Sequence, residues 1–415
     1  MEMTALDRKP IKVLLILGPT IFDHPDLTAK KINEITAGMD EHWRMYIIAG
    51  ARAQITLPCP LEIHTVPLMG SSKSVLPRVA YLLSCIIKGA ELVKKESIHV
   101  VTQHDGHLEY GMVAYIVSRL THRKCLIRVN EDTLIPLMFF LRASGHRAFK
   151  SKTILRIVAS VYRRMECVLF EHADWVITHG PMDYQKIKRI TNRITFVPLS
   201  IDTERFRRLN KVATREFREK FSIAKNAKVI LFVGRLHPEK GVETLLKAIK
   251  LMQDWEVLLL MVYSVSDYKK DYEKLAEQLG ISNKVRFLGY VPHAELPKYY
   301  SMADLYVLPS MREEWSNTIM EAMACEAPVV ATEVGANPYL VIEGKTGFLA
   351  PPNDPSSLAK KMCLVFENPE LIKRIVETAA CEIRRYNQDK IGELYKTVVK
   401  NMVRKPDARA LTTSH

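Results

Sequence analysis

The sequence predicts an α/β protein with two domains, each built on a parallel sheet. Strand-like apolar runs alternate with amphipathic helical segments along most of the chain, which is typical of a parallel sheet with helices on both faces. The alternation is interrupted near residue 207 and restarts at Val229, so two similar halves follow one another. A length of 415 residues also exceeds what a single hydrophobic core usually serves.

The first half contains the elements of an N-terminal domain that we predict over residues 1–200. Its strands are expected at 13–17, 45–49, 63–67, 100–103, 125–129, 175–178 and 194–197. Its helices are expected at 29–39, 76–94, 111–120 and 152–172, with one more before the last strand.

A second domain is predicted over residues 201–387. Its strands are expected at 229–233, 257–262, 285–288, 305–309 and 329–332. The charged segment 207–221 before them is interpreted as a linker. From Asp354 the pattern becomes helical, the last helix is expected at 389–403, and residues 405–415 are predicted to form a disordered tail.

Two carboxylates eight residues apart frame the start of a helix in the second domain. An apolar strand at 305–309 is followed by a polar crossing and by helical spacing from Asn317 to Ala324, so Glu313 precedes the helix and Glu321 lies within it. The first N–H groups of such a helix attract an anion such as a diphosphate. Glu321 reaches the same end and could accept hydrogen bonds from a pair of hydroxyls, as ribose carries. The alternative is that Glu313 merely favours the helix N-terminus and Glu321 is an ordinary helical residue.

A second strand, turn and helix lies about eighty residues earlier. The strand 229–233 is followed by Gly234, where backbone can turn closely, and Gly241 opens the next helix. Arg235 and Lys240 lie in the loop between these glycines. Ligands of open α/β sheets bind at the carboxyl ends of strands, so the two cations are candidates for a phosphate clamp. Alternatively, both are ordinary solvated charges.

With both elements in view, the chain resembles the retaining GT-B glycosyltransferases known as glycosyltransferase family 4, or glycosyl transferases group 1. Glu313 and Glu321 match the Glu-x7-Glu signature of that family, and Arg235 and Lys240 match its basic loop. The segment PVVATEVGANPYLVIEGKTGFLAPPNDPSSLA continues the resemblance to residue 359, and the resemblance is strong from about residue 193 onward.

The resemblance implies a GT-B fold, in which two Rossmann-like domains with parallel sheets face a central cleft. It also implies that the chain crosses back after RYN, so that a helix at about 388–404 joins the first domain. By resemblance, Glu313 contacts the donor sugar, Glu321 contacts the ribose, and Arg235 and Lys240 neutralise the diphosphate. The N-terminus of the helix, at Ser316, Asn317 and Thr318, and the close backbone at Gly234 and Gly18 complete the expected donor site.

No metal or cofactor is expected, because the cations and the helix N-terminus can stabilise a departing diphosphate and the sequence has no Asp-x-Asp motif. The acceptor is expected to meet the first domain, where two polar segments follow strands. The candidates there are His104, Asp105, Asn130 and Glu131. For His104 a purely structural, hydrogen-bonded role is an equal alternative.

The acceptor half departs from the pattern of many relatives. They have a Gly-rich loop after the first strand, of which this chain retains only Gly18, and a His-Gly pair where Asn130 and Glu131 stand here. Tyr339 also occupies a position that is commonly acidic in relatives.

The composition is that of a globular protein with an excess of basic residues. Hydrophobic residues make up 47% and charged residues 26%, and the net charge is +14. Residues 1–200 hold 27 Lys and Arg against 18 Asp and Glu. Neither a secretion signal nor a membrane-spanning run is evident, and the seven cysteines lack metal-ligand spacing, so we expect reduced thiols and a cytoplasmic location.

Residues 139–164 mix basic and apolar side chains, which suits contact with the cytoplasmic face of an anionic membrane. The alternative is a solvated helix whose apolar stripe packs inward. No nucleic-acid-binding module accompanies the charge, so nucleic acid is not expected as a partner.

The sequence therefore predicts a hexosyltransferase-like enzyme. It would move a sugar from a UDP- or GDP-sugar to a hydroxyl of a saccharide or lipid-linked acceptor, in polysaccharide or glycolipid biosynthesis. Two alternatives stay open: a non-catalytic nucleotide-sugar-binding subunit of the same fold, and a nucleotide-sugar epimerase.

Overall fold

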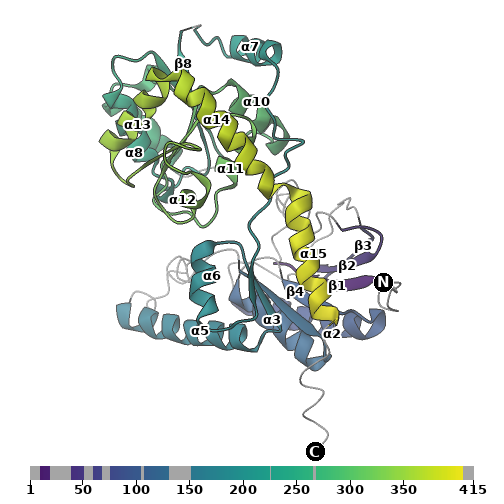
Figure 1. Ribbon diagram of the computed structural model, residues 1–415. Coiled ribbons are helices and arrows are strands. Elements are labelled where there is room, and N and C mark those ends of the chain that lie inside the picture. The colour runs from purple at the N-terminus through teal and green to yellow at the C-terminus, as the bar shows by residue number, and fades with distance from the viewer. Residues whose placement is uncertain are drawn as a thin grey trace, which may run out of the picture. The chain divides into compact units, whose positions relative to one another are not determined.

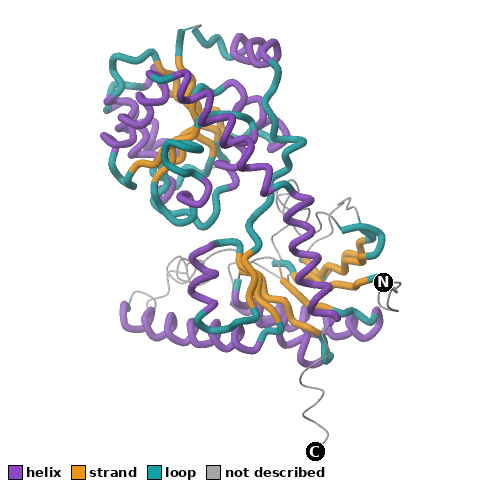
Figure 2. Tube along the Cα trace, in the orientation of Figure 1, coloured by secondary structure: helices purple, strands orange, loops and turns teal. Residues whose placement is uncertain are grey.

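The computed structural model describes residues 10–18, 39–50, 59–67, 75–103, 107–129, 151–224, 226–264 and 268–404. The chain divides into two compact units (Figure 1). Unit 1 combines Met1–Pro198 with Asp389–His415, and unit 2 is Leu199–Gln388. In each unit the strands are flanked by helices, as Figure 2 shows.

The described part of unit 1 has a seven-stranded sheet in the order β3-β2-β1-β4-β5-β6-β7, and all of its paired strands are parallel. Its core is formed by buried residues of these strands and of the helices that cover them, and the strand residues include Leu14, Tyr46 and Val101. The strands are β1 (Ile11–Ile16), β2 (Trp43–Ala49), β3 (Leu61–Thr65), β4 (Val100–Gln103), β5 (Lys124–Val129), β6 (Trp175–Thr178) and β7 (Ile194–Phe196).

The helices of unit 1 are α2 (Val75–Glu96), α3 (Leu108–Leu120), α5 (Lys152–His172), α6 (Pro181–Lys188) and the C-terminal α15 (Gln388–Arg404). The sequence predicts the bounds of α5 correctly and starts α3 three residues too late. The helix expected at 29–39 lies outside the described residues except for Met39, and the tail 405–415 also lies outside them.

Helix α15 is part of unit 1 because its apolar face is buried there. Ile391, Tyr395 and Val399 are buried. The ring of Tyr395 lies 5.5 Å from the guanidinium of Arg128, which is buried near the carboxyl end of β5. Arg128 also contacts Nε2 of His179 at 3.1 Å. Burial, and then the charge of Arg128, lowers the pKa of His179 to about 3, so the imidazole stays neutral.

The described part of unit 2 has a six-stranded parallel sheet in the order β10-β9-β8-β11-β12-β13. Its strands are β8 (Lys228–Val233), β9 (Val257–Val262), β10 (Val285–Gly289), β11 (Leu305–Leu308), β12 (Val329–Thr332) and β13 (Phe348–Ala350). The three residues of β13 are too few to show a period, and the sequence does not predict this strand.

The helices of unit 2 surround this sheet and close a core that includes Phe232, Leu259 and Val307. They are α7 (Lys211–Lys220), α8 (Val242–Leu251), α9 (Lys269–Gln278), α10 (Leu296–Met302), α11 (Asn317–Ala324), α12 (Asn337–Leu340), α13 (Pro355–Glu367) and α14 (Pro369–Ile383). Short 3₁₀ turns lie at Pro238–Lys240, Ser282–Lys284, His293–Glu295 and Arg384–Tyr386.

The interpretation of 207–221 as a linker is wrong, because α7 occupies this segment. Asn210 caps the helix by accepting a hydrogen bond from the N–H of Ala213 at 2.8 Å. Phe217 and Phe221 both pack edge-on against the ring of Tyr299 in α10. The many charged residues of α7 suggest a solvated linker when only the sequence is considered. The helix nevertheless packs against unit 2 through two aromatic residues four positions apart.

Candidate donor site

The order of strands in unit 2 reverses between β8 and β11. From β8 the chain proceeds to β9 and β10 on one side, and from β11 it proceeds to β12 and β13 on the other. The loops that leave β8 and β11 therefore turn in opposite directions, which is the arrangement that places ligands at the carboxyl ends of strands in open α/β sheets. These are the loops with Arg235, Lys240 and Glu313.

Two glycines let backbone segments meet closely around these loops. Gly241 ends the loop after β8 with φ of +65°, and a Cβ there would lie 1.9 Å from the carbonyl oxygen of Pro309. Gly335 has φ of +52°, and a Cβ there would lie 1.5 Å from the carbonyl oxygen of Glu313. No other residue fits at either position without moving the backbone of the loop after β11.

Lys240, in the loop after β8, and Glu313, in the loop after β11, form an ion pair. Nζ of Lys240 donates to Oε1 of Glu313 at 2.6 Å, and Oγ of Ser310 donates to the same oxygen at 2.6 Å. The other carboxylate oxygen, Oε2, accepts no hydrogen bond from any described residue. Lys240 also keeps two of its three N–H bonds for further acceptors. The pair can therefore accept a hydroxyl on one side and hold an anion on the other.

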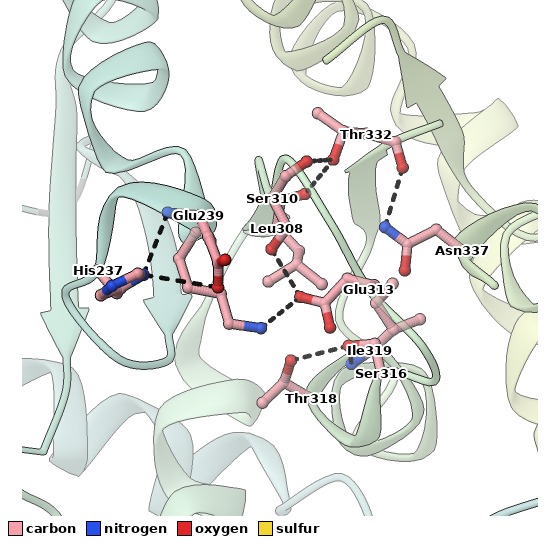
Figure 3. A network of polar contacts seen from close by, with 11 residues as sticks. His237, Glu239, Leu308, Ser310, Glu313, Ser316, Thr318, Ile319, Thr332 and Asn337 are labelled. Atoms are coloured by element: carbon pink, nitrogen blue, oxygen red, sulfur yellow. Dashed lines mark hydrogen bonds and ion pairs between the residues drawn. The ribbon is translucent and has the colours of Figure 1, made fainter. Parts of the chain in front are cut away.

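Hydrogen bonds to two neighbouring segments hold the loop with Glu313 in place. On one side the N–H of Met311 donates to the carbonyl of Glu239 at 2.7 Å. On the other side Thr332, at the end of β12, donates to the carbonyl of Ser310, and Asn337 donates to the carbonyl of Thr332 at 2.9 Å. Figure 3 shows Thr332 beside Ser310 and Asn337 beside Thr332. Glu313 is thus held in place by backbone contacts that do not depend on a ligand.

The N-terminus of α11 opens toward this loop. Ser316 is its N-cap, and its hydroxyl accepts a hydrogen bond from the N–H of Ile319 at 3.3 Å. The hydroxyl of Thr318 lies 3.1 Å from that of Ser316. The N–H groups of Asn317 and Thr318 come too early in the helix to have an acceptor within it. They are donors that an anion can meet, and the binding of a diphosphate there stays a prediction.

Glu321 lies buried within α11. Only 2% of its surface is exposed to solvent. Both oxygens already have protein partners: Nε2 of His293 lies 2.9 Å from Oε1, and the hydroxyl of Tyr300 donates to Oε2 at 2.9 Å. Burial, and then the charge of Glu321, raises the pKa of Tyr300 well above its usual value, so this donor stays protonated.

The surroundings of Glu321 join three segments of unit 2. The ring of Phe206 lies 5.0 Å from that of His293 and 6.3 Å from that of Tyr300. Because a buried carboxylate needs donors, His293 and Tyr300 attach α10 and the turn before it to α11. The contact of Glu321 with ribose stays a prediction, and a hydroxyl pair would have to share this carboxylate with the two protein donors.

Arg235 and Gly234 follow β8 directly. Gly234 is half-buried, and a Cβ there would meet the ring of Phe232 at 3.2 Å. The side chain of Arg235 is exposed and forms no ion pair with any described residue. The structure therefore brings Lys240 to Glu313, while a contact of Arg235 with a diphosphate stays a prediction.

The acceptor candidates His104, Asp105, Asn130 and Glu131 lie outside the described residues, as does the part of the basic segment from 139 to 150. Gly18 is described and is buried beyond the end of β1. Across the described ranges, no three His, Cys, Asp or Glu side chains are grouped so that they could hold a metal ion. All seven cysteines are free thiols.

Several residues of the site do not stand out in the sequence. Ser310 lies two residues after β11 and Thr332 is the last residue of β12, and their position at strand ends is a usable signal. His293 and Tyr300 lie far from Glu321 in the chain, so no spacing connects them to it. Only the packing of α10 beside α11 reveals them.

Comparison with known proteins shows what part of this chain is similar to. Residues 213–381 match the model of the glycosyl transferases group 1 family. D-inositol 3-phosphate glycosyltransferase of Corynebacterium glutamicum is 32% identical over 221 residues, which cover 51% of this chain and 53% of that protein. Alpha-D-kanosaminyltransferase of Streptomyces kanamyceticus is 30% identical, over 50% of this chain and 58% of that protein. The match thus spans about half the length of these relatives.

The fold extends over most of the chain. The structure is similar to that of Anabaena Alr3699/HepE in complex with UDP, with a TM-score of 0.73, 19% identity and coverage of 94% of this chain and all of that one (100%). It is also similar to sucrose-phosphate synthase from Thermosynechococcus elongatus, with a TM-score of 0.75, 18% identity and coverage of 94% and 99%. Residues 213–381 are thus similar to the glycosyl transferases group 1 family, and the chain has the GT-B fold.

Proposed function

We propose that the protein is a retaining glycosyltransferase that uses a nucleotide diphosphate sugar, with UDP or GDP as the nucleotide, as its donor. The observation that carries the proposal is the Lys240–Glu313 ion pair beside the N-terminus of α11, at the point where the strand order of unit 2 reverses. Positive and negative groups that lie together at the carboxyl ends of strands suit a ligand with a diphosphate at one end and a polyhydroxyl ring at the other.

In the proposed reaction the bond between the anomeric carbon and the diphosphate oxygen breaks, and the acceptor oxygen forms a bond to the same face of the sugar. The acceptor proton passes to the departing phosphate. Lys240, Arg235 and the N–H groups at Asn317 and Thr318 stabilise the negative charge that develops there. Glu313 accepts a sugar hydroxyl through Oε2 and orients the ring. Its Oε1 stays with Lys240 and Ser310.

These protein groups supply the charge that a metal would otherwise supply, so we propose turnover without a divalent cation. A saccharide or lipid-linked acceptor in polysaccharide or glycolipid assembly, on the cytoplasmic face of a membrane, is proposed for unit 1. In the described part of the chain no helix combines the length and apolar character needed to cross a bilayer.

Selective thermal stabilisation by a nucleotide sugar is the expected outcome of the first test. The melting temperature of the full chain is measured with UDP-, GDP- and ADP-sugars in the presence of a chelator. A ligand at about 100 times its dissociation constant adds roughly 2.7 kcal/mol to the free energy of unfolding. We expect a shift with one nucleotide, reduced in Arg235→Ala and Glu321→Ala.

Arg286→Ala is a suitable control, since Arg286 lies on β10, away from the reversal of strand order. The proposal fails if no nucleotide sugar shifts the melting temperature of the folded wild type. Stabilisation without sugar transfer to any acceptor or to water would instead indicate a non-catalytic binding subunit, and epimerised donor would indicate an epimerase.

A further inference from the structure

Helix α2 has apolar side chains on two faces. One stripe, with Tyr81, Cys85 and Leu92, is buried in the core of unit 1. A second stripe at helical spacing points outward: Leu76 is 80% exposed, Ile87 is 72% exposed, and Leu83 lies between them and is also exposed. The packing of unit 1 does not require an outward apolar stripe of this kind. Such a stripe indicates a surface that binds another apolar surface.

Helix α5 repeats this arrangement. Leu155, Tyr162 and Leu169 face the core, while Ile157, Val161, Met165 and their neighbours Ile154 and Val168 are exposed, Ile157 to 59%. The outward residues follow one another at intervals of three and four, which places them in one line along the helix. Both helices therefore present a continuous apolar line to the outside of unit 1.

The two helices belong to one surface. Figure 1 shows α2 and α5 on the same side of unit 1 with α3 between them. Leu82 and Ile86 of α2, Met112 and Ile116 of α3, and Met165 of α5 line a common apolar groove of about 410 Å³. We call the groove together with both outward stripes the α2–α5 face.

The apolar area of the α2–α5 face is wider than the groove. At about 100° per residue, Leu76, Leu83 and Ile87 lie on the side of α2 that is turned away from Leu82 and Ile86. A single helix or peptide bound in the groove would leave these three residues in water. The apolar region of a lipid bilayer is flat, so it could cover the outward stripes of α2 and α5 at the same time.

The charges beside the stripes select for an anionic surface. Arg156 and Arg164 of α5 are exposed and form no ion pair with any described residue. Two acidic neighbours are neutralised, since Glu109 pairs with Arg78 at 2.5 Å and Glu91 with Lys88 at 3.0 Å. The sequence of α5 holds Lys152, Arg156, Arg163 and Arg164 against Glu166 and Glu171. Two copies of such a face would repel each other, whereas anionic headgroups would attract it.

We propose that the α2–α5 face is a peripheral membrane-binding surface that inserts its two apolar stripes among the headgroups of an anionic bilayer. The surface shares residues 152–164 of α5 with the segment that the sequence singles out, and it adds α2, the groove and the rest of the outward stripe of α5. This inference does not rest on the sugar-transfer reaction, since no residue of the donor site takes part in it.

Binding of the full chain to lipid vesicles tests the proposal. The fraction that sediments with vesicles of phosphatidylcholine alone is compared with the fraction that sediments with phosphatidylcholine mixed with phosphatidylglycerol. We expect binding to the mixed vesicles, weakened by salt. Leu83→Gln with Ile87→Gln, and Ile157→Gln with Val161→Gln, should each weaken it at least about tenfold. Arg156→Gln with Arg164→Gln should weaken it and remove most of its salt dependence.

Leu251→Gln is the matched control, because Leu251 is a 57% exposed leucine of α8 in unit 2. It should bind vesicles as the wild type does, and all variants should melt near the wild-type temperature because the changed residues are exposed. The proposal is overturned if the wild type does not bind anionic vesicles, or if the face variants bind as well as Leu251→Gln. It is equally overturned if the wild type self-associates in sedimentation velocity and the face variants are monomeric without any vesicle binding.

Discussion

Replacing Gly335 with alanine is expected to lower the free energy of unfolding of unit 2 by roughly 3–5 kcal/mol. The new Cβ would lie 1.5 Å from the carbonyl oxygen of Glu313, at a φ of +52° that non-glycine residues rarely adopt. The clash can be removed only if the loop after β11 moves, and that loop holds Glu313 beside Lys240. We therefore expect a large fall in melting temperature together with loss of stabilisation by nucleotide sugar.

Gly344→Ala separates the clash from the backbone strain. Gly344 has a similar φ of +68°, but no atom lies within 4 Å of the position of its Cβ. This variant should lose only about 1–2 kcal/mol, the cost of the left-handed conformation. Equal losses in the two variants would contradict the close approach of Gly335 to Glu313.

Replacing Glu313 with glutamine is expected to lower kcat for sugar transfer by about 10²–10³. The change keeps the shape of the side chain but removes the charge that faces Lys240 and weakens the acceptance of a sugar hydroxyl at Oε2. The rate is followed as release of nucleoside diphosphate from the donor that stabilises the protein, with an acceptor or with water. The melting temperature should change little, since Ser310 can still donate to the amide oxygen.

Glu314→Gln is the adjacent control. Glu314 is paired with Arg312 at 2.6 Å and does not contact Lys240 or Ser310. Its rate should stay within about threefold of the wild type, as expected for a surface ion pair. Indistinguishable rates for the two variants would remove Glu313 from the reaction.

The secondary structure of both units can be predicted from the sequence where elements have a clear period. The strands β8, β9 and β12 and the helix α5 are of this kind, because their apolar residues follow the period of a buried strand or of a helix. Helix α7 is missed because its buried contacts are only two aromatic residues, and β13 because it has three residues.

The candidate donor site is predictable only in part. The two loops are recognisable since each follows a buried strand and precedes a helix. What the sequence does not show is the reversal of strand order between β8 and β11, which brings the loops together from about eighty residues apart. The partners of Glu321 are hidden for the same reason, as His293 and Tyr300 reach it only through the packing of α10 beside α11.

The preference of the protein for a diphosphate over a monophosphate tests the central claim most directly. Calorimetric titration of the wild type with the nucleoside diphosphate and the nucleoside monophosphate of the selected base should show at least about tenfold tighter binding of the diphosphate, since one charge-assisted contact is worth about 1.5–3 kcal/mol. Arg235→Ala and Lys240→Ala should reduce this ratio toward one and leave the affinity for the monophosphate nearly unchanged. A ratio that is the same in the wild type and in both variants would contradict a diphosphate clamp in unit 2.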